Sequence, residues 1–453
     1  MKILIAGGGK VGASLAQKLS AAGYDVTVID QKQSVLDNLQ ERFDVMAVQG
    51  NCAAMDTLIQ AGIKEVNLLI AVTSEDEKNL LCCMTAHGLN PDLHTIARIR
   101  NPEYSDQVYV MRDLFALSMA VNPEKQAAIE IEHLLKYPGF LKRDTFAKGR
   151  MELVELRIDA KSKLCDVALN DLNGIVKQHK VLVCTVLRDG KAIAPDGNFV
   201  LREGDHIFVT APTKNLTHLL RSLGIITHKV KRVLICGGDR ISYYLAKNLN
   251  QSGIDVTIIE SDYDRCLHLA SILPEVTVVH GDAGDQFILE QEGVSNCDAA
   301  VTLTGLDELN IIISMYASSC GVSQVITKLG HLSDNRMVDR LDIGSPICPK
   351  ESCSELIVRY VRAIHNQTGA ALSVHSIAHG QAEAMEFIVD EKTLHCGEPL
   401  KMLKTKKSVL IAGICRGTHT QVPDGDSMFM PGDTVIVISN GDDVIYSLND
   451  IFE

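Results

Sequence analysis

The sequence predicts an α/β protein with two doubly wound parallel-sheet domains, each followed by a small α+β domain. Three observations predict this fold class. Short apolar segments alternate with amphipathic helical segments, a glycine-rich turn follows the first apolar segment, and the whole pattern occurs twice. Apolar strands separated by helices are typical of a parallel sheet covered on both faces.

The duplication is visible along the whole chain. The segment ILIAGGGKVGASLAQKLSAAGYDVTVID from Ile3 is echoed by VLICGGDRISYYLAKNLNQSGIDVTIIE from Val233. Further pairs follow in the same order and at nearly constant spacing: Gly7 with Gly237, Asp30 with Glu260, Thr73 with Thr304, Asn79 with Asn310, Arg98 with Lys328, Gly204 with Gly432 and Asp205 with Asp433. We therefore expect two copies of an N-type and a C-type unit, with boundaries at residues 1–140, 141–229, 230–368 and 369–453.

Elements of the first N-type unit follow from apolar periodicity. Strands are expected at residues 2–6, 25–29, 44–48, 68–72, 95–98 and 116–121, with helices between them that include residues 11–22 and 75–87. The C-type units alternate short strands with turn residues, which suits a small α+β module. Helices that begin near Pro123 and Pro349 carry apolar residues at helical spacing. They are expected to be crossover or dimerisation helices, or plain core-facing helices.

Composition limits the possible partners and surroundings. The 453 residues exceed what one core usually supports, and 44 Lys+Arg against 57 Asp+Glu give a formal net charge of −13. Nucleic acid is therefore a poor partner, because its backbone requires a concentrated cationic surface. The 13 cysteines form no C-x-x-C motif, and no secretory signal or long apolar run occurs. A reducing, cytoplasmic location is expected, without a membrane span.

A glycine loop in the first half predicts a nucleotide site. The run Gly7-Gly8-Gly9-Lys10-Val11-Gly12 follows a predicted strand and opens a predicted helix. Such Rossmann-like loops allow a tight turn and a close approach of pyrophosphate to the helix N-terminus. Asp30 ends the second strand, where a carboxylate accepts hydrogen bonds from ribose and favours NAD(H) over NADP(H). The alternative is a glycine turn without a ligand.

Two further segments are expected to close this site. Thr73 and Ser74 end the fourth strand, and Ser74 with Glu77 matches a capping box for the next helix. Arg98 lies at the end of the fifth strand, on the same edge, where a guanidinium can pair with phosphate. The alternatives are a plain helix start and a surface salt bridge. Arg100 is a weaker candidate for the same role.

The second copy differs in its loop. Asp239 replaces the second glycine and Ser242 the third. A carboxylate there repels pyrophosphate, with Arg240 beside it as a partial offset. The residues that remain for a second site are Gly237, Gly238, Glu260 and Lys328. We expect this site to be weak, altered or filled by a different nucleotide.

Motifs for catalysis and metal binding are missing from the sequence. It contains no G-x-S-x-G elbow, P-loop or H-E-x-x-H motif, and the repeated residues of the C-type units are turn formers rather than catalysts. Cys83 and His87 share a helix face, but without further spaced ligands they are expected to be ordinary buried side chains rather than a metal site. Neither a catalytic residue nor a metal ligand is therefore assigned.

The motifs resemble the regulator-of-potassium-conductance (RCK) family. The resemblance rests on GGGKVG, Asp30, the run AVTSEDEKN and the run ARIRNPEY, and it covers essentially the whole chain. Tandem N-type and C-type copies in a chain of this length are similar to peripheral subunits of the Trk potassium uptake system. The chain departs from the family pattern at Asn51, where aspartate is frequent, and at Asp239 and Ser242.

The resemblance implies a cytoplasmic, non-enzymatic protein at the inner face of the cell membrane. It implies binding of NAD(H), and of ATP or ADP in relatives, at Gly7 to Val11, Asp30, Thr73, Ser74 and Arg98. It also implies self-association as a dimer or a tetrameric ring that gates a TrkH-type potassium-translocating membrane protein. Two alternatives remain open, an NAD-dependent oxidoreductase and a nucleotide-sensing subunit of a potassium efflux system.

Overall fold

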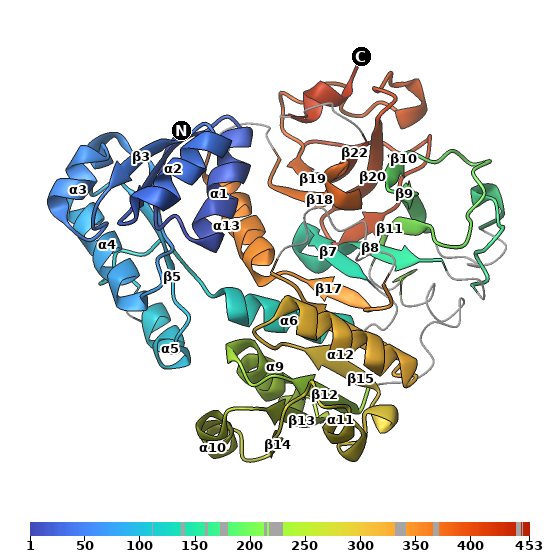
Figure 1. Ribbon diagram of the computed structural model, residues 1–453. Coiled ribbons are helices and arrows are strands. Elements are labelled where there is room, and N and C mark those ends of the chain that lie inside the picture. The colour runs from blue at the N-terminus through green and yellow to red at the C-terminus, as the bar shows by residue number, and fades with distance from the viewer. Residues whose placement is uncertain are drawn as a thin grey trace. The chain divides into compact units, whose positions relative to one another are not determined.

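The computed structural model describes residues 1–110, 112–136, 141–158, 162–172, 180–212, 215–216, 230–330, 341–365, 371–440, 445 and 447–453. Within these residues the strands form two sheets of six strands and two of five (Figure 1). The six-stranded sheets are parallel and the five-stranded sheets antiparallel. This confirms the predicted fold class. Each of the four predicted ranges contains one sheet, and the boundaries between them stay a prediction.

The first parallel sheet has the strand order β3-β2-β1-β4-β5-β6. Its strands lie close to the predicted segments: β1 Lys2–Ala6, β2 Asp25–Asp30, β3 Met46–Gln49, β4 Leu68–Ala71, β5 His94–Arg98 and β6 Met119–Val121. The helices between them are α1 Lys10–Ala21, α2 Gln33–Arg42, α3 Met55–Gln60, α4 Asp76–Leu89 and α5 Pro102–Val110. Alternate residues such as Ile3 and Leu4 are buried on opposite faces, because helices cover both sides of the sheet.

The second parallel sheet repeats this topology as β14-β13-β12-β15-β16-β17. Its strands are β12 Arg232–Cys236, β13 Asp255–Glu260, β14 Thr277–His280, β15 Ala299–Thr302, β16 Gln324–Lys328 and β17 Ser345–Ile347. Its helices are α9 Arg240–Gln251, α10 Tyr263–Ile272, α11 Gln286–Gln291 and α12 Asp307–Ser319. The shared topology confirms that the sequence duplication is a duplication of fold.

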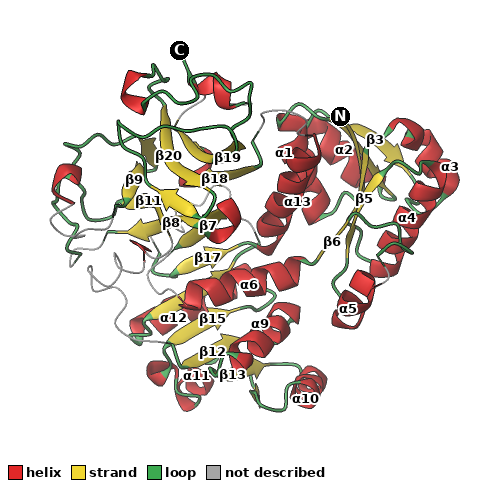
Figure 2. Cartoon of the chain, turned by 180° about the vertical axis from the view of Figure 1, so that it is seen from behind, coloured by secondary structure: helices red, strands yellow, loops and turns green. Residues whose placement is uncertain are grey.

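The two antiparallel sheets belong to the C-type units (Figure 2). The first consists of β7 Lys142–Phe146, β8 Met151–Arg157, β9 Leu182–Arg188, β10 Lys191–Ile193 and β11 His206–Pro212. The second consists of β18 Ser373–Ile377, β19 Ala382–Ile388, β20 Val409–Arg416, β21 His419–Gln421 and β22 Thr434–Asn440. Their inner faces share one apolar core, to which Phe208 and Ile436 contribute. Across this contact the Thr185 hydroxyl donates to Asn440 Oδ1 at 2.6 Å.

Two turn aspartates of these units are buried. Asp205 and Asp433 are 1% and 2% exposed, and each accepts hydrogen bonds from an arginine of a neighbouring strand, Arg188 and Arg416. The preceding Gly204 has a left-handed φ of +85°. The glycine therefore serves the turn, as its residue type suggests, whereas the aspartate is a buried carboxylate that pairs with a more exposed arginine.

Two long helices cross between the halves of the chain. Contacts divide the molecule into one compact unit of residues Met1–Ala128 with Cys348–Val361, and a second of Ile129–Ile347 with Arg362–Glu453. α6 (Pro123–Lys136) continues from the first unit into the second, where Gln324 Nε2 donates to the Leu134 carbonyl at 2.7 Å. α13 (Pro349–His365) returns to the first unit, and Ile357 is buried in the core of the first sheet. The crossover prediction is confirmed; a dimerisation role stays a prediction.

Candidate nucleotide site

The glycine loop between β1 and α1 forms the base of the site. Gly7 has a φ of +105°, a conformation that side chains rarely permit. A Cβ on Gly12 would lie 1.9 Å from the Gly7 carbonyl oxygen, so only glycine fits there. A Cβ on Gly9 would meet no atom within 4 Å. The loop is therefore tightly packed at its ends and open at Gly9, where the N-terminus of α1 begins.

Asp30 holds the loop from the neighbouring strand. Its Oδ2 accepts a hydrogen bond from the Gly8 amide at 2.7 Å, and its Oδ1 accepts one from the Lys32 amide at 2.9 Å. Each carboxylate oxygen keeps a further lone pair for a ribose hydroxyl. A Cβ on Gly8 would come within 2.7 Å of the Val35 side chain, so this glycine serves packing.

Asn79 connects the carboxyl ends of β4 and β5. This side chain is 0% exposed. Its Oδ1 accepts hydrogen bonds from the Thr73 amide at 2.9 Å and the Thr73 hydroxyl at 2.7 Å, and its Nδ2 donates to the Arg98 carbonyl at 2.8 Å. The residue is thus placed to fix the relative position of two predicted site residues. In the sequence, the only signal for Asn79 is that the two halves share this position with Asn310.

The predicted capping box between Ser74 and Glu77 is wrong. α4 begins at Asp76 with Glu75 at its N-cap, and no side chain caps it. The Asp76 carboxylate instead accepts hydrogen bonds from the Arg100 and Asn101 amides at 2.8 and 2.7 Å. The segment that follows β5 thus donates hydrogen bonds to the carboxylate at the start of α4. Local sequence could not show this, because the donors lie in another strand connection.

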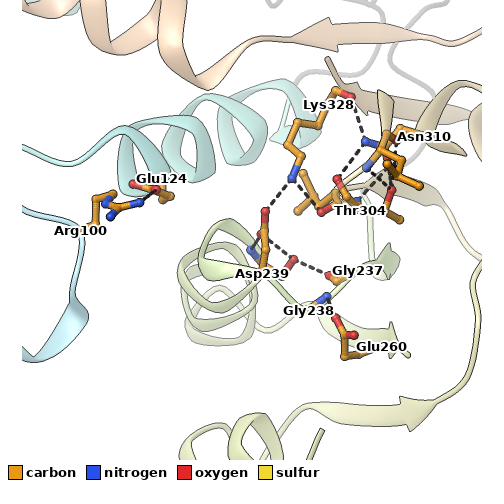
Figure 3. Close-up of polar contacts among 12 residues, drawn as sticks. Arg100, Glu124, Gly237, Gly238, Asp239, Glu260, Thr304, Asn310 and Lys328 are labelled. Atoms are coloured by element: carbon orange, nitrogen blue, oxygen red, sulfur yellow. Dashed lines mark hydrogen bonds and ion pairs between the residues drawn. The ribbon is translucent and has the colours of Figure 1, made fainter. Parts of the chain in front are cut away.

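Arg98 presents a half-buried cation to the site. Its Nε is buried and has no hydrogen-bond partner among the described residues. Burial lowers the pKa of this guanidinium, and neighbouring Arg100 lowers it further. An arginine in a protein nevertheless stays charged, and its guanidinium pairs well with carboxylate or phosphate oxygens. Arg100 itself lies 3.9 Å from both Asp76 and Glu124, and its Nη2 donates to the Ser74 carbonyl (Figure 3 shows the pair with Glu124). Arg100 is therefore part of a structural network.

These elements line a cavity of about 540 Å³ at the carboxyl ends of β1 and β4. These two strands are neighbours in the sheet, and the strand order reverses between them. Parallel α/β sheets place their ligands at this switch point. Predicted site residues that line it are Gly7, Gly9, Lys10, Val11, Asp30, Thr73, Ser74 and Arg98. Gly8 and Gly12 shape the loop from behind.

Further residues line the cavity without having been predicted: Ile29, Gln31, Lys32, Val35, Gly50, Cys52, Val72, Glu75, Lys78, Pro123, Glu124, Pro349 and Lys350. Lys32 and Lys78 are cations on the adjoining helical segments. Pro349 and Lys350 arrive with α13, so the crossover helix completes the wall; no local signal indicates this. Asn51 does not line the cavity; its side chain accepts a hydrogen bond from the Ala53 amide at 3.2 Å.

The second half brings its predicted residues together in the same way, but a side chain of its own loop, Asp239, occupies the space that is open beside Gly9 in the first half. Gly237 repeats the φ of +105°, and Glu260 accepts a hydrogen bond from the Gly238 amide at 2.6 Å. Lys328 Nζ, however, lies 2.7 Å from Asp239 Oδ2 (Figure 3). The charge of Asp239 is thus offset by Lys328, not by the adjacent Arg240 that the sequence suggested.

The remaining thiols and histidines form no metal cluster in the part of the chain that the structure describes. Cys83 is buried, and burial raises the pKa of its thiol to about 12. Its Sγ lies 3.8 Å from the Ile96 carbonyl. This is the environment of an ordinary packed cysteine.

Family models match both kinds of unit. The TrkA-N domain matches residues 3–123 and 233–349, and the TrkA-C domain matches residues 153–224 and 384–449. The chain belongs to the TrkA family. The Trk system potassium uptake protein TrkA of Halomonas elongata is 30% identical over 445 residues, 96% of this chain and 95% of that protein. The TrkA homologue of Archaeoglobus fulgidus is 30% identical over 445 residues, 98% of each chain.

Solved structures support the fold. A crystal structure of the GsuK RCK domain superposes with a TM-score of 0.62 at 15% identity, over 97% of this chain and 92% of that chain. A structure of the GsuK channel bound to NAD gives a TM-score of 0.61 at 15% identity, over 97% of this chain and 76% of that chain. At this identity the likeness shows the fold alone, and it agrees with the RCK-type tandem arrangement predicted from the sequence.

Proposed function

We propose that the first N-type half binds NAD(H) as a regulatory ligand, with ATP or ADP as alternative nucleotides. The observation that carries this proposal is the cavity that joins an open Gly9, the Asp30 carboxylate and the unpartnered Nε of Arg98. These groups suit a pyrophosphate at a helix N-terminus, a ribose and a phosphate oxygen, respectively. The NAD-bound GsuK channel of similar fold agrees with this assignment.

The nucleotide acts on a potassium uptake system through a membrane partner. Among the described residues no helix is long and apolar enough to cross a bilayer. The relatives are named as Trk system potassium uptake proteins. The chain lies at the inner face of the membrane, self-associates as a dimer or a tetrameric ring, and gates a TrkH-like potassium-translocating protein. A nucleotide that binds one ring conformation better than another shifts their populations.

Calorimetric titration of the full chain with NAD, NADH, ATP and ADP tests the ligand. We expect saturable binding of at least one of the dinucleotides, and loss of that binding in Gly9→Asp. No heat with any of the four nucleotides would refute the site. A steady NADH absorbance at 340 nm during incubation with the protein is expected of a regulator; turnover with a small-molecule substrate would favour the oxidoreductase alternative.

Genetic complementation tests the transport role. We expect deletion of the gene to impair growth at low external potassium, and Gly9→Asp to restore growth poorly. The protein should co-purify with the TrkH-like partner when both are expressed. Normal growth at low potassium without a redundant uptake system, together with a defect in potassium release, would favour the efflux alternative.

A further inference from the structure

The second half contains an ion pair where the first half has open space. Asp239 stands at the position of Gly9 in the repeat, and Lys328 at that of Arg98. The Lys328 ammonium lies 2.7 Å from Asp239 Oδ2 and also donates to the Leu303 carbonyl at 2.9 Å. The lysine is therefore satisfied within the chain, whereas the Nε of Arg98 is buried without a partner.

The Asp239 carboxylate also occupies the N-terminus of α9. Its Oδ1 accepts a hydrogen bond from the Ser242 amide at 3.0 Å and lies 3.2 Å from the Ser242 hydroxyl oxygen. The same hydroxyl donates to the Gly237 carbonyl at 2.6 Å. In the first half, N-cap Gly9 supplies no such side-chain acceptor to α1. An internal carboxylate thus uses the helix N-terminus that would otherwise receive a phosphate.

A second cation fastens the loop from the opposite side. Arg265 Nε donates to the Gly238 carbonyl at 2.6 Å, and its Nη2 donates to the Asp239 carbonyl at 3.3 Å. The equivalent position in the first half is Val35, whose side chain lines the cavity. The second loop is therefore held by side-chain hydrogen bonds at a position where the first offers an apolar wall.

We propose that the second half is closed to dinucleotides by its own Asp239–Lys328 pair, so that each chain takes one dinucleotide, in the first half. This inference rests on the proposed function of the first half. The Asp239 carboxylate takes the place of a ligand phosphate against both the N-terminus of α9 and the cation at the end of β16. The second half therefore keeps a ligated arrangement at every nucleotide concentration, and only the first half responds to nucleotide.

The electrostatics explain why a pyrophosphate does not displace this carboxylate. Entry of a dinucleotide would bring its negative phosphates beside Asp239, which is only 35% exposed. Like charges in a partly shielded site repel one another, and moving Asp239 aside would leave the N-terminus of α9 without its cap. An entering phosphate could at best remake the two contacts that Asp239 already makes, and the repulsion between the two negative groups would remain.

The test is the stoichiometry of NADH binding to the full chain, measured by calorimetry at protein concentrations well above Kd. We expect one equivalent in the natural sequence and none in Gly9→Asp, which closes the first loop as Asp239 closes the second. The double variant Asp239→Gly with Ser242→Gly restores the glycine pattern and should bind two equivalents. The variant Asp239→Asn removes the charge but keeps the size of the side chain, and it should bind a second, weaker equivalent. It provides the test if the double variant fails to fold.

The outcomes separate this inference from the proposed function. Two equivalents in the natural sequence, or one remaining in Gly9→Asp, would overturn the closure of the second half while leaving nucleotide binding intact. Failure of both second-half variants to gain an equivalent, with the first site still active, would also overturn it. No binding to the natural sequence would refute the proposed function itself.

Discussion

Gly9 and Gly12 belong to one loop, yet their missing side chains serve different purposes. The space beside Gly9 is open to the cavity, whereas Gly12 packs against the Gly7 carbonyl. A substitution at Gly9 should therefore change ligand binding and leave folding alone, and a substitution at Gly12 should change folding first.

We predict that Gly9→Asp removes detectable NADH binding, a weakening of at least about 100-fold, because its carboxylate would lie beside the pyrophosphate. Its free energy of unfolding should stay within about 0.5 kcal/mol of the natural protein. Gly12→Ala should lose about 1–3 kcal/mol or more, because its Cβ overlaps the Gly7 oxygen. Calorimetry and thermal unfolding of both variants check this; equal stability of the two variants would contradict the assigned roles.

The two arginines after β5 allow a second residue-scale prediction. Arg98→Gln should weaken NADH binding by about 1.5–3 kcal/mol, the range of a charged hydrogen bond. Its stability without ligand should be unchanged or slightly higher, because the Arg98 Nε is buried without a partner. The measurements are nucleotide titration and thermal unfolding of the ligand-free protein.

Arg100→Gln is the matched control. This arginine lies near two carboxylates, Asp76 and Glu124, and does not line the cavity. Its loss should lower stability more than Arg98→Gln does, with a smaller effect on affinity. A large loss of stability with normal binding in Arg98→Gln would assign Arg98 a structural role instead.

At the scale of elements, one buried asparagine in each half connects neighbouring strand ends. Asn79 bridges Thr73 and the Arg98 carbonyl, and Asn310 makes the same bonds to Thr304 and the Lys328 carbonyl. Asn79 and Asn310 therefore have the same structural role, one in the half proposed to bind nucleotide and one in the half proposed to be closed to it.

We predict that Asn79→Ala and Asn310→Ala each lower the free energy of unfolding by about 2–4 kcal/mol, since each leaves several buried polar groups unsatisfied. Only Asn79→Ala should also weaken NADH binding, because only the first half takes the nucleotide. Chemical denaturation and calorimetry distinguish the effects. Equal losses of affinity in both variants would show that the halves are not functionally separate.

At the scale of the whole molecule, the crossover helices make each half depend on the other. Ile357 and Val361 of α13 are buried in the core of the first sheet, although they belong to the second half of the sequence. A fragment of residues 1–230 lacks this helix. Its own α6 carries buried apolar residues that include Ile131 and Leu134, so we expect two fragments to cover each other by exchanging helices.

We predict that this fragment forms a dimer, whereas its variant with α6 made polar at Ile131 and Leu134 aggregates or stays unfolded. Light scattering after size-exclusion chromatography provides the measurement. In the full chain, Ile357→Ala should cost about 2–5 kcal/mol of stability. A stable monomeric fragment would show that the first sheet does not need a crossover helix.

The sequence alone determined the duplicated α/β plan, most strand positions and the glycine loop with Asp30. These features are encoded by local periodicity and by residues whose backbone needs are specific, as at Gly7 and Gly12. The repeat also indicated which positions had diverged, such as Asp239. Each of these signals can be read from one segment of the sequence or from the alignment of the two repeats.

Only the tertiary structure decided what those side chains contact. Asn79 connects the ends of two strands, and Lys328 rather than Arg240 pairs with Asp239. Lys350 of α13 lines a cavity whose other residues belong mostly to the first N-type unit. The incorrect capping box at Ser74 has the same origin. A hydrogen bond or an ion pair depends on distance in space, and residues that lie far apart in the sequence meet only when the sheet and its crossover helices have assembled.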